Sequence, residues 1–368
     1  MIMKAFCDGG DLAEAVGRAI RAISNKSGNP ILDNIRIEAS EGTLTFTATD
    51  NELTVTTGIV ADVSDGGTAL VPGKLFSDFT RRLTSERISL ESAGSKMTLR
   101  YGDSESEFAC ASPDDYPDLP EVSDARSFAM EEGALKDLIN KVAFSVRQDD
   151  VRPILKGVLL EVENGAVTAV ALDGYRLAKC VKPARLAGDA MKAVVPARCM
   201  NEIARLLGDG EEEARVYVQP GRVRADIGHT SVVSVLYEGE FVAYRNIIRT
   251  SFDTLVTVSA QQLYDSLERA LLLTRDDRSN PVRFDITERT MRITSASGRG
   301  NLDERLAVVT SGPDLTIAFN AKYFTELLRV CGADSVTIKL NSPADPCVVV
   351  PCGGGEDFLY LVLPVRVS

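Results

Sequence analysis

The residues of this chain that could do chemistry are scattered acidic groups, one histidine and seven cysteines. Acidic clusters stand at Asp114–Asp115, Asp149–Asp150, Glu211–Glu213 and Asp276–Asp277. Paired carboxylates can hold two metal ions for phosphodiester hydrolysis. These acids fall in expected turns and connections, where a solvated loop charge is the more common role. A metal-dependent nuclease or hydrolase therefore stays open as an alternative, and it predicts Mg²⁺-dependent turnover that Asp→Asn changes abolish.

The sequence gives little support for nucleophilic catalysis or for nucleotide binding. His229 follows a glycine between two strand-like runs, which predicts a hairpin turn. Because it is the one histidine of the chain, no other histidine is left for a catalytic triad or a zinc site. Cys347 and Cys352 form the closest cysteine pair, without a histidine nearby, so we expect reduced, mostly buried thiols. Val71–Lys74 ends like a phosphate-binding loop, but Leu75 replaces the required Ser or Thr, which favours a helix start. Asp173, before a glycine, is typical of a turn. No cofactor and no metal are expected.

Composition sets the broad class. The chain has 368 residues, 44% hydrophobic and 26% charged, which predicts two or three globular domains. No apolar stretch approaches the roughly 18 residues that a membrane helix needs. The first residues lack the apolar core of a signal peptide, so we expect a cytoplasmic protein.

The elements that must position any site recur three times. Val195–Pro196 precedes a helical segment, Pro72 stands 124 residues earlier in the same context, and Asn320 stands 124 residues later. Three repeats therefore account for the whole chain, with boundaries at 1–125, 126–253 and 254–368. The segments 113–120 and 241–251 are expected to connect them.

Each repeat contains an amphipathic helix, alternating strands, a second short helix and further strands, which predicts an α+β fold. We expect helices over residues 12–23, 74–82, 135–147, 197–207, 263–275 and 321–331. These windows hold 14 Lys and Arg against 7 acids, although the whole chain carries −12. The helices are therefore +7 and everything else is −19.

A basic surface on an acidic protein suggests sequence-independent contact with a phosphate backbone. For any single helix, a solvated basic face is the simpler interpretation. A scaffold that binds only proteins also stays open. It predicts that charge reversal at Arg198 and Arg205 leaves DNA retention unchanged.

Four segments resemble the bacterial sliding clamp family, the β subunit of DNA polymerase III. Residues 171–178 (ALDGYRLA) resemble the family's T-D-G-H/Y-R-L-A, and residues 151–157 (VRPILKG) resemble D-V-R-x-x-L-x-G. Residues 241–245 (FVAYR) are similar to F-P-D-Y-R, and residues 360–366 (YLVLPVR) to Y-x-x-M-P-M-R. The similarity runs over the full chain, repeats included.

The resemblance implies three clamp domains, each with two helices packed on antiparallel sheets, in a ring-shaped head-to-tail homodimer. It implies a non-enzymatic processivity factor for DNA replication that encircles double-stranded DNA by topology. The family tethers the catalytic subunit of DNA polymerase III, clamp-loader subunits and other proteins that carry clamp-binding peptides. No membrane partner is implied, and the protein would lie in the cytoplasm, at the nucleoid during replication.

The resemblance also assigns three sets of residues. The DNA-facing set is Lys26, Lys74, Arg81, Arg152, Arg198, Arg205, Lys322 and Arg329. The dimer-joint set is Phe108, Leu272, Leu273, Asp303 and Glu304. The peptide-cleft set is Leu155, Leu172, Gly174, Tyr175, Arg176, Leu177, Val242, Asn246, Ile247, Val362, Leu363, Pro364, Val365 and Arg366.

Three positions depart from the family pattern. Val242 replaces a common proline, Asn246 stands where arginine is frequent, and the chain runs on to Val367–Ser368. These changes leave open the preferred client peptides and whether this is a main, a specialised or an accessory clamp.

Overall fold

The computed structural model describes residues 2–24, 28–122, 126–274, 281–353 and 357–366. Within them one order of elements occurs three times: a strand, a long helix, five strands, a second helix and three strands. The predicted threefold repeat is confirmed at this level.

The first repeat contains helices α1 (Gly9–Ala19) and α2 (Gly73–Thr80). Its strands are β1 (Ile2–Asp8), β2 (Asn34–Ser40), β3 (Thr43–Thr49), β4 (Leu53–Val60), β5 (Asp62–Asp65), β6 (Gly67–Pro72), β7 (Arg87–Ala93), β8 (Lys96–Tyr101) and β9 (Ser104–Ala109). The second repeat contains helices α3 (Glu132–Ala143) and α4 (Ala197–Leu206). Its strands are β10 (Ser127–Glu131), β11 (Gly157–Glu163), β12 (Ala166–Leu172), β13 (Arg176–Pro183), β14 (Arg185–Ala187), β15 (Met191–Pro196), β16 (Glu213–Gln219), β17 (Arg222–Ile227) and β18 (Thr230–Val235).

The third repeat contains helices α5 (Ala260–Leu273) and α6 (Ala321–Val330). Its strands are β19 (Thr254–Ser259), β20 (Pro281–Ile286), β21 (Thr290–Ser297), β22 (Gly300–Ala307), β23 (Val309–Ser311), β24 (Leu315–Asn320), β25 (Ser335–Leu340), β26 (Cys347–Pro351) and β27 (Phe358–Val362). Short 3₁₀ turns are η1 (Ile20–Ala22), η2 (Pro30–Asp33), η3 (Pro113–Asp115), η4 (Pro153–Lys156) and η5 (Tyr244–Asn246).

The six predicted helices are present, with shifted ends. Helix α1 begins at Gly9 because the Asp8 carboxylate accepts hydrogen bonds from the backbone of Gly10 and Asp11, at 2.7 and 3.0 Å. The glycine pair at 9–10 concealed this start, since glycine is a poor helix former. The predicted apolar face of α1 is buried, including Leu12 and Val16.

Every repeat supplies five strands to one antiparallel sheet and four strands to another. The five-stranded part of the second repeat joins the four-stranded part of the first, giving the order β14-β10-β16-β17-β18-β4-β3-β2-β6. The third and second repeats join in the same way, as β15-β11-β12-β13-β27-β26-β25-β19-β23. The five-stranded sheet β5-β1-β7-β8-β9 and the four-stranded sheet β22-β21-β20-β24 stand alone.

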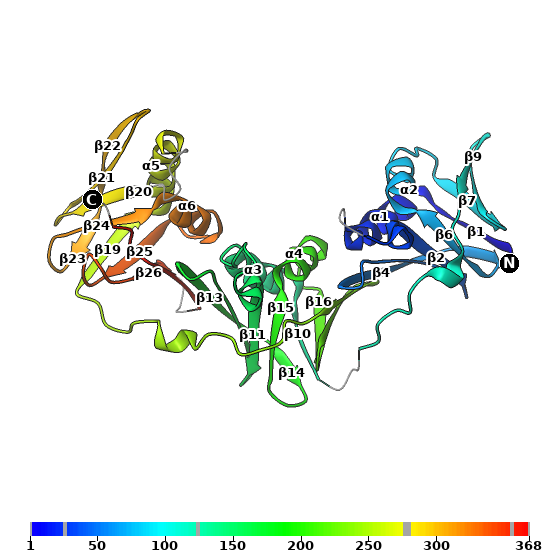
Figure 1. Ribbon diagram of the computed structural model, residues 1–368, viewed down its shortest axis with the longest axis horizontal. Coiled ribbons are helices and arrows are strands. Elements are labelled where there is room, and N and C mark those ends of the chain that lie inside the picture. The colour runs from blue at the N-terminus through cyan, green and yellow to red at the C-terminus, as the bar shows by residue number, and fades with distance from the viewer. Residues whose placement is uncertain (1, 25–27, 123–125, 275–280, 354–356, 367–368) are drawn as a thin grey trace. The chain divides into compact units, whose positions relative to one another are not determined.

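The chain forms two compact bodies, and the second repeat contributes to both. One body comprises residues 1–136, 185–189 and 202–236, and the other comprises 137–184, 190–201 and 237–368. Each body contains one nine-stranded sheet and one of the separate sheets. Within the first body α1 contacts α2, and within the second α5 contacts α6 (Figure 1). None of the helices in the described ranges is long and apolar enough to cross a membrane.

Candidate functional site

The described acids among those first considered for catalysis do not assemble into a metal centre. No group of three or more His, Cys, Asp or Glu within the described residues could hold a metal ion. Asp149 pairs with Arg147 at 2.5 Å and Asp150 pairs with Lys156 at 2.5 Å, so both acids belong to a loop held by ion pairs. The pair Asp276–Asp277 lies outside the described residues.

The predicted turn residues are confirmed. His229 is exposed in the turn between β17 and β18. The Asp173 carboxylate accepts hydrogen bonds from the backbone of Tyr175 and Arg176, at 2.8 and 3.1 Å. Pro72 precedes the first residue of α2, so Val71–Lys74 is a helix start. All seven cysteines are free thiols, five of them buried.

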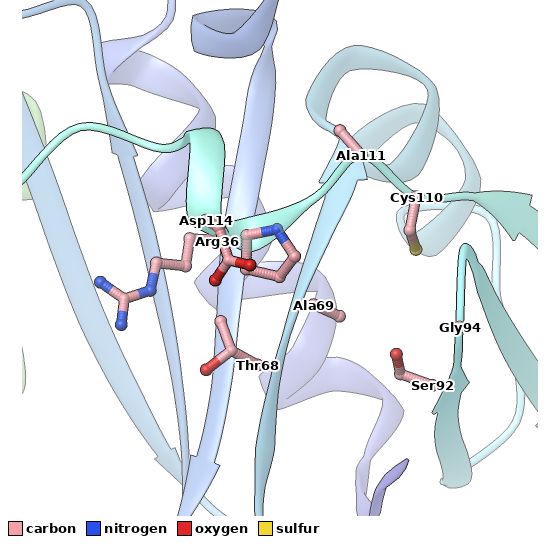
Figure 2. Close-up of a pocket in the computed structure, with 9 residues that line it drawn as sticks. Arg36, Thr68, Ala69, Ser92, Gly94, Cys110, Ala111 and Asp114 are labelled. Carbon is pink, nitrogen blue, oxygen red and sulfur yellow. The ribbon is translucent and has the colours of Figure 1, made fainter. Parts of the chain in front are cut away.

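A pocket of about 290 Å³ in the first repeat is lined in part by a cysteine (Figure 2). Cys110 and Ser92 lie on one side of this pocket, and the Arg36 guanidinium points away from them. Burial raises the pKa of the Cys110 thiol, which keeps it protonated and poorly nucleophilic. Because the one histidine of the chain is not among the residues that line this pocket, Cys110 and Ser92 have no imidazole base there.

The predicted peptide-cleft residues meet around one apolar cluster in the second body. Leu155, Leu172 and Leu177 are buried in it, and Val242 and Leu363 are half-buried against it. The cluster draws on η4, β12, β13, the connection after β18, and the end of the chain. Its other buried members are Leu159, Val170, Val194, Phe241, Tyr244, Val348 and Leu361.

Apolar side chains remain on the surface beside this cluster. Tyr175 is 61% exposed, and its backbone oxygen accepts a hydrogen bond from the backbone of Leu363 at 2.8 Å. Ile247 is also exposed, and its backbone N–H donates to the carbonyl of Tyr244, a cluster member. We call Tyr175, Val242, Ile247 and Leu363 the apolar patch. Asn246 and Arg366 are exposed, Pro364 and Val365 are half-buried, and Val362 is buried within β27.

Arg176 belongs to the interior, which the sequence alone did not indicate. Its side chain is 7% exposed and donates hydrogen bonds to Asp173, Glu326 and the Phe144 carbonyl. The guanidinium carbon also lies 4.6 Å from the centre of the Tyr323 ring. Burial alone would lower the pKa of Arg176, but Tyr360 and Glu326 raise it above its usual range. Arg176 therefore positions the exposed Gly174–Tyr175 turn through Asp173.

Glu161 holds the connection that carries half of the apolar patch. This glutamate on β11 accepts hydrogen bonds from the Tyr244 hydroxyl at 2.8 Å and from Arg245 at 2.6 Å, and it pairs with Lys192 at 3.3 Å. Burial opposes ionisation, yet the bonds from Tyr244 and Arg245 lower the pKa of Glu161. Glu161 stands between apolar residues in the middle of β11, which was a usable signal, because a buried charge requires partners.

The described members of the DNA-facing set are all exposed. Lys74 lies in the first turn of α2, Arg198 and Arg205 lie on α4, and Lys322 and Arg329 lie on α6. Arg81 directly follows α2, Arg152 precedes η4, and Lys26 lies outside the described residues.

Several of these cations are paired with acids on the same helices. Arg81 contacts Asp78 at 2.5 Å, Arg205 contacts Glu202, and Lys322 approaches Glu326 at 3.7 Å. Arg81 and Asp78 are both exposed, and an ion pair of this kind is weak and can exchange for a phosphate. Glu202 is buried, and Glu326 is also bound to Arg176.

The dimer-joint set divides into residues that are exposed and residues that already pack or pair within their own chain. Leu272 is 68% exposed on α5, and Leu273 is half-buried. Phe108 is instead buried, with its ring in edge contact with Phe76 and Phe79 at centroid distances of 5.2 and 5.1 Å.

The two acids of the joint set already have partners in their own chain. Asp303 forms two hydrogen bonds with Arg292, at 2.8 and 2.6 Å. Glu304 forms two with Arg269, at 2.7 and 2.8 Å. Sequence reasoning did not identify Arg292 or Arg269 as the partners of these acids.

Comparison with known proteins defines the class. Three family models match in order: the N-terminal domain of the DNA polymerase III beta subunit over residues 3–120, its central domain over 129–242 and its C-terminal domain over 245–366. The beta sliding clamp of Synechococcus elongatus is 28% identical over 374 residues, covering 99% of both chains. That of Halalkalibacterium halodurans is 27% identical over 366 residues, covering 95% of this chain and 96% of its own.

Solved structures agree with the family models. The beta subunit of DNA polymerase from Streptococcus pyogenes is 27% identical, with a TM-score of 0.94 over 99% of this chain and 100% of its own. A sliding clamp from Pseudomonas aeruginosa, solved with griselimycin, is 26% identical with a TM-score of 0.94 and the same coverage.

Three repeats with shared sheets and exposed basic helices define a DNA clamp. The chain belongs to the DNA polymerase III beta subunit family. Members of this family are sliding clamps, processivity factors of replication without catalytic activity of their own.

Proposed function

We propose that two copies of this chain close head to tail into a ring around duplex DNA. The observation that carries the proposal is that the five-stranded and the four-stranded sheet each stand alone. One nine-stranded sheet is joined by the pairing of β4 with β18, and the other by the pairing of β13 with β27. The equivalent strands left over are β22 and β9, each at the end of its sheet. Pairing β22 with β9 of a second copy would build the same nine-stranded sheet again.

Head-to-tail contacts either close into a ring or continue as a filament. Family membership supports closure by two chains of three domains, and we propose the domain bounds 1–125, 126–253 and 254–368. The protein would act in the cytoplasm, at the nucleoid during replication.

The exposed cations on the helices suit a phosphate backbone that must slide. Lys74, Arg152, Arg198 and Arg329 are exposed, and topology retains the DNA, so each interaction with a phosphate can be weak. The net charge of −12 would disfavour DNA on other surfaces.

The apolar patch suits the peptides of replication proteins, including the polymerase subunit and the clamp loader. Its floor is preformed by the buried cluster, and its exposed members Tyr175 and Ile247 can cover a hydrophobic anchor residue of a peptide.

The proposal is tested by sedimentation velocity and electron-microscopic class averages of the purified chain at micromolar concentration. We expect a six-lobed ring of two chains. Leu272→Arg should dissociate it, because this exposed side chain lies on α5, which contacts the edge strand β22, and folding should be preserved. Leu75→Arg, on α2, is the matched control, since Leu75 is also an exposed helical leucine. Isolated chains of wild type at this concentration would contradict the proposal.

DNA encirclement needs a separate measurement. Dissociated chains are mixed with nicked circular duplex, concentrated so that they associate, and separated by gel filtration. We expect co-elution with the circle and release of the protein once the DNA is made linear. Retention on linear DNA would indicate ordinary binding and contradict a topological link.

A further inference from the structure

The first helix of each repeat carries an acid and a base four residues apart at the same place. In each helix the acid stands two residues after the first buried leucine of the apolar face, and the base stands six residues after that leucine. The three pairs are Glu14 and Arg18 on α1, Asp137 and Lys141 on α3, and Asp265 and Arg269 on α5.

At the joint between the first and second repeats, the base reaches the neighbouring strand. Arg18 pairs with Glu14 at 2.5 Å, and its other amino group donates to the Thr230 hydroxyl at 2.9 Å. Thr230 is the first residue of β18, and its hydroxyl is 2.9 Å from that of Thr57 on β4. The cation therefore bridges from its own helix to the strand that the other repeat supplies.

The joint between the second and third repeats has the same arrangement with different chemistry. Lys141 pairs with Asp137 at 2.8 Å, and its ammonium lies 5.6 Å from the centre of the Phe358 ring. Phe358 is the first residue of β27, as Thr230 is of β18. A hydroxyl acceptor in one joint is replaced by a cation–π contact in the other.

In the third repeat no strand of this chain lies beyond β22 within the described residues, and the base has a different partner. Arg269 makes its two hydrogen bonds to Glu304 on β22, the edge strand itself. Asp265, the acid that would match Glu14 and Asp137, instead accepts a hydrogen bond from Gln261 at 2.7 Å. Arg269 is 53% exposed and Glu304 is 27% exposed, so water can solvate both groups when this pair opens.

We propose that Arg269 changes partner when the ring closes, releasing Glu304 and bridging to the first residue of β9 in the second copy. That residue is Ser104 of the partner subunit, the equivalent of Thr230 and Phe358. Its hydroxyl is an acceptor like that of Thr230, and it is flanked in sequence by Asp103 and Glu105, whose charges attract a guanidinium. This inference rests on the proposed head-to-tail dimer and names the residue that locks its joint.

The test is a set of dimer dissociation constants from sedimentation equilibrium. Arg269→Ala should weaken the dimer about tenfold, because each of the two joints loses the charged hydrogen bond to Ser104, partly offset by the pair with Glu304 that the free chain also loses. Ser104→Ala should weaken it less, and the double variant should match Arg269→Ala alone, which shows that the two side chains act on each other.

Glu304→Gln separates a change of partner from a simple structural role. If Arg269 must leave Glu304, this variant frees it and the dimer should be as tight as wild type or tighter. If the Arg269–Glu304 pair itself supports the joint, Glu304→Gln should weaken the dimer as Arg269→Ala does, and the inference is overturned. Arg292→Ala is the matched control, because it removes another doubly bonded acid pair of β22. Asp303 and Glu304 are adjacent and so face opposite sides of the sheet.

The outcomes distinguish this inference from the proposed function. A wild-type chain that stays monomeric contradicts the ring. A wild-type dimer that Leu272→Arg disrupts, but whose dissociation constant Arg269→Ala changes by less than twofold, supports the ring and overturns only the role of Arg269. Thermal melting of Arg269→Ala checks that the variant is folded.

Discussion

Arg176 and Arg329 have similar neighbours and opposite surroundings. Each guanidinium lies over a tyrosine ring and contacts a glutamate: Tyr323 and Glu326 for Arg176, Tyr264 and Glu268 for Arg329. Arg176 is 7% exposed, and Arg329 is 56% exposed. The buried group is bound to its partners because no solvent can replace them. The exposed group can release its glutamate for another anion, so burial decides which arginine is structural and which can bind a ligand.

The largest expected effect comes from removing the buried member of this comparison. Arg176→Ala leaves Asp173 and Glu326 without their cation and should destabilise the second body by about 3–5 kcal/mol. Hydrogen exchange at the amides of β13 and β27 measures it, because these strands pair through this region. If Arg176→Ala and Arg329→Ala lowered the stability equally, burial would not distinguish the structural arginine from the exposed one.

An intermediate effect is expected at Glu161, a second buried charge with several donors. Glu161→Gln should cost about 1.5–3 kcal/mol at neutral pH, the range for hydrogen bonds to a charged group. Hydrogen exchange in the connection 236–253 reports it. The matched control is Glu163→Gln, since Glu163 is exposed at the end of the same strand.

The pH dependence of Glu161 has a definite sign. Its pKa is lowered from 4.5 in the folded protein, so its contribution is complete above the unfolded pKa and disappears as pH falls through the folded value. Protection of the connection should therefore fall in acid for wild type and stay flat for Glu161→Gln. Equal profiles for the two proteins would show that Glu161 does not hold the connection.

The smallest effect on stability is expected at the exposed member. Arg329→Ala should change the free energy of unfolding by about 0–1 kcal/mol. If this side chain faces DNA, the slope of log affinity against log salt should decrease by about one for each phosphate that the protein no longer neutralises. Gel filtration with circular duplex at several salt concentrations measures it. An unchanged salt slope would place Arg329 away from the DNA.

Local sequence patterns were sufficient to predict the helices, strands and turns, but they did not predict which partners the side chains bind. The apolar faces of the helices and the turn roles of His229 and Asp173 were predictable, because they depend on neighbours close in sequence. The partners of Arg176 and Glu304 were not, since Glu326 and Arg269 are distant along the chain or on another element. Phe108 on β9 stays a prediction for the dimer joint, and its ring contacts with Phe76 and Phe79 were not predictable from the sequence.

What the sequence determined by itself is the threefold repeat, its α+β elements and the excess of positive charge on its helices. These follow from periodicity and composition, which are properties of the chain alone. Only the tertiary structure decided which charges are buried, which are paired, and which sheet edges are left over. Strand pairing across repeats joins residues far apart in sequence, so β9 and β22 emerge as unpaired only because their equivalents are paired, β18 with β4 and β27 with β13.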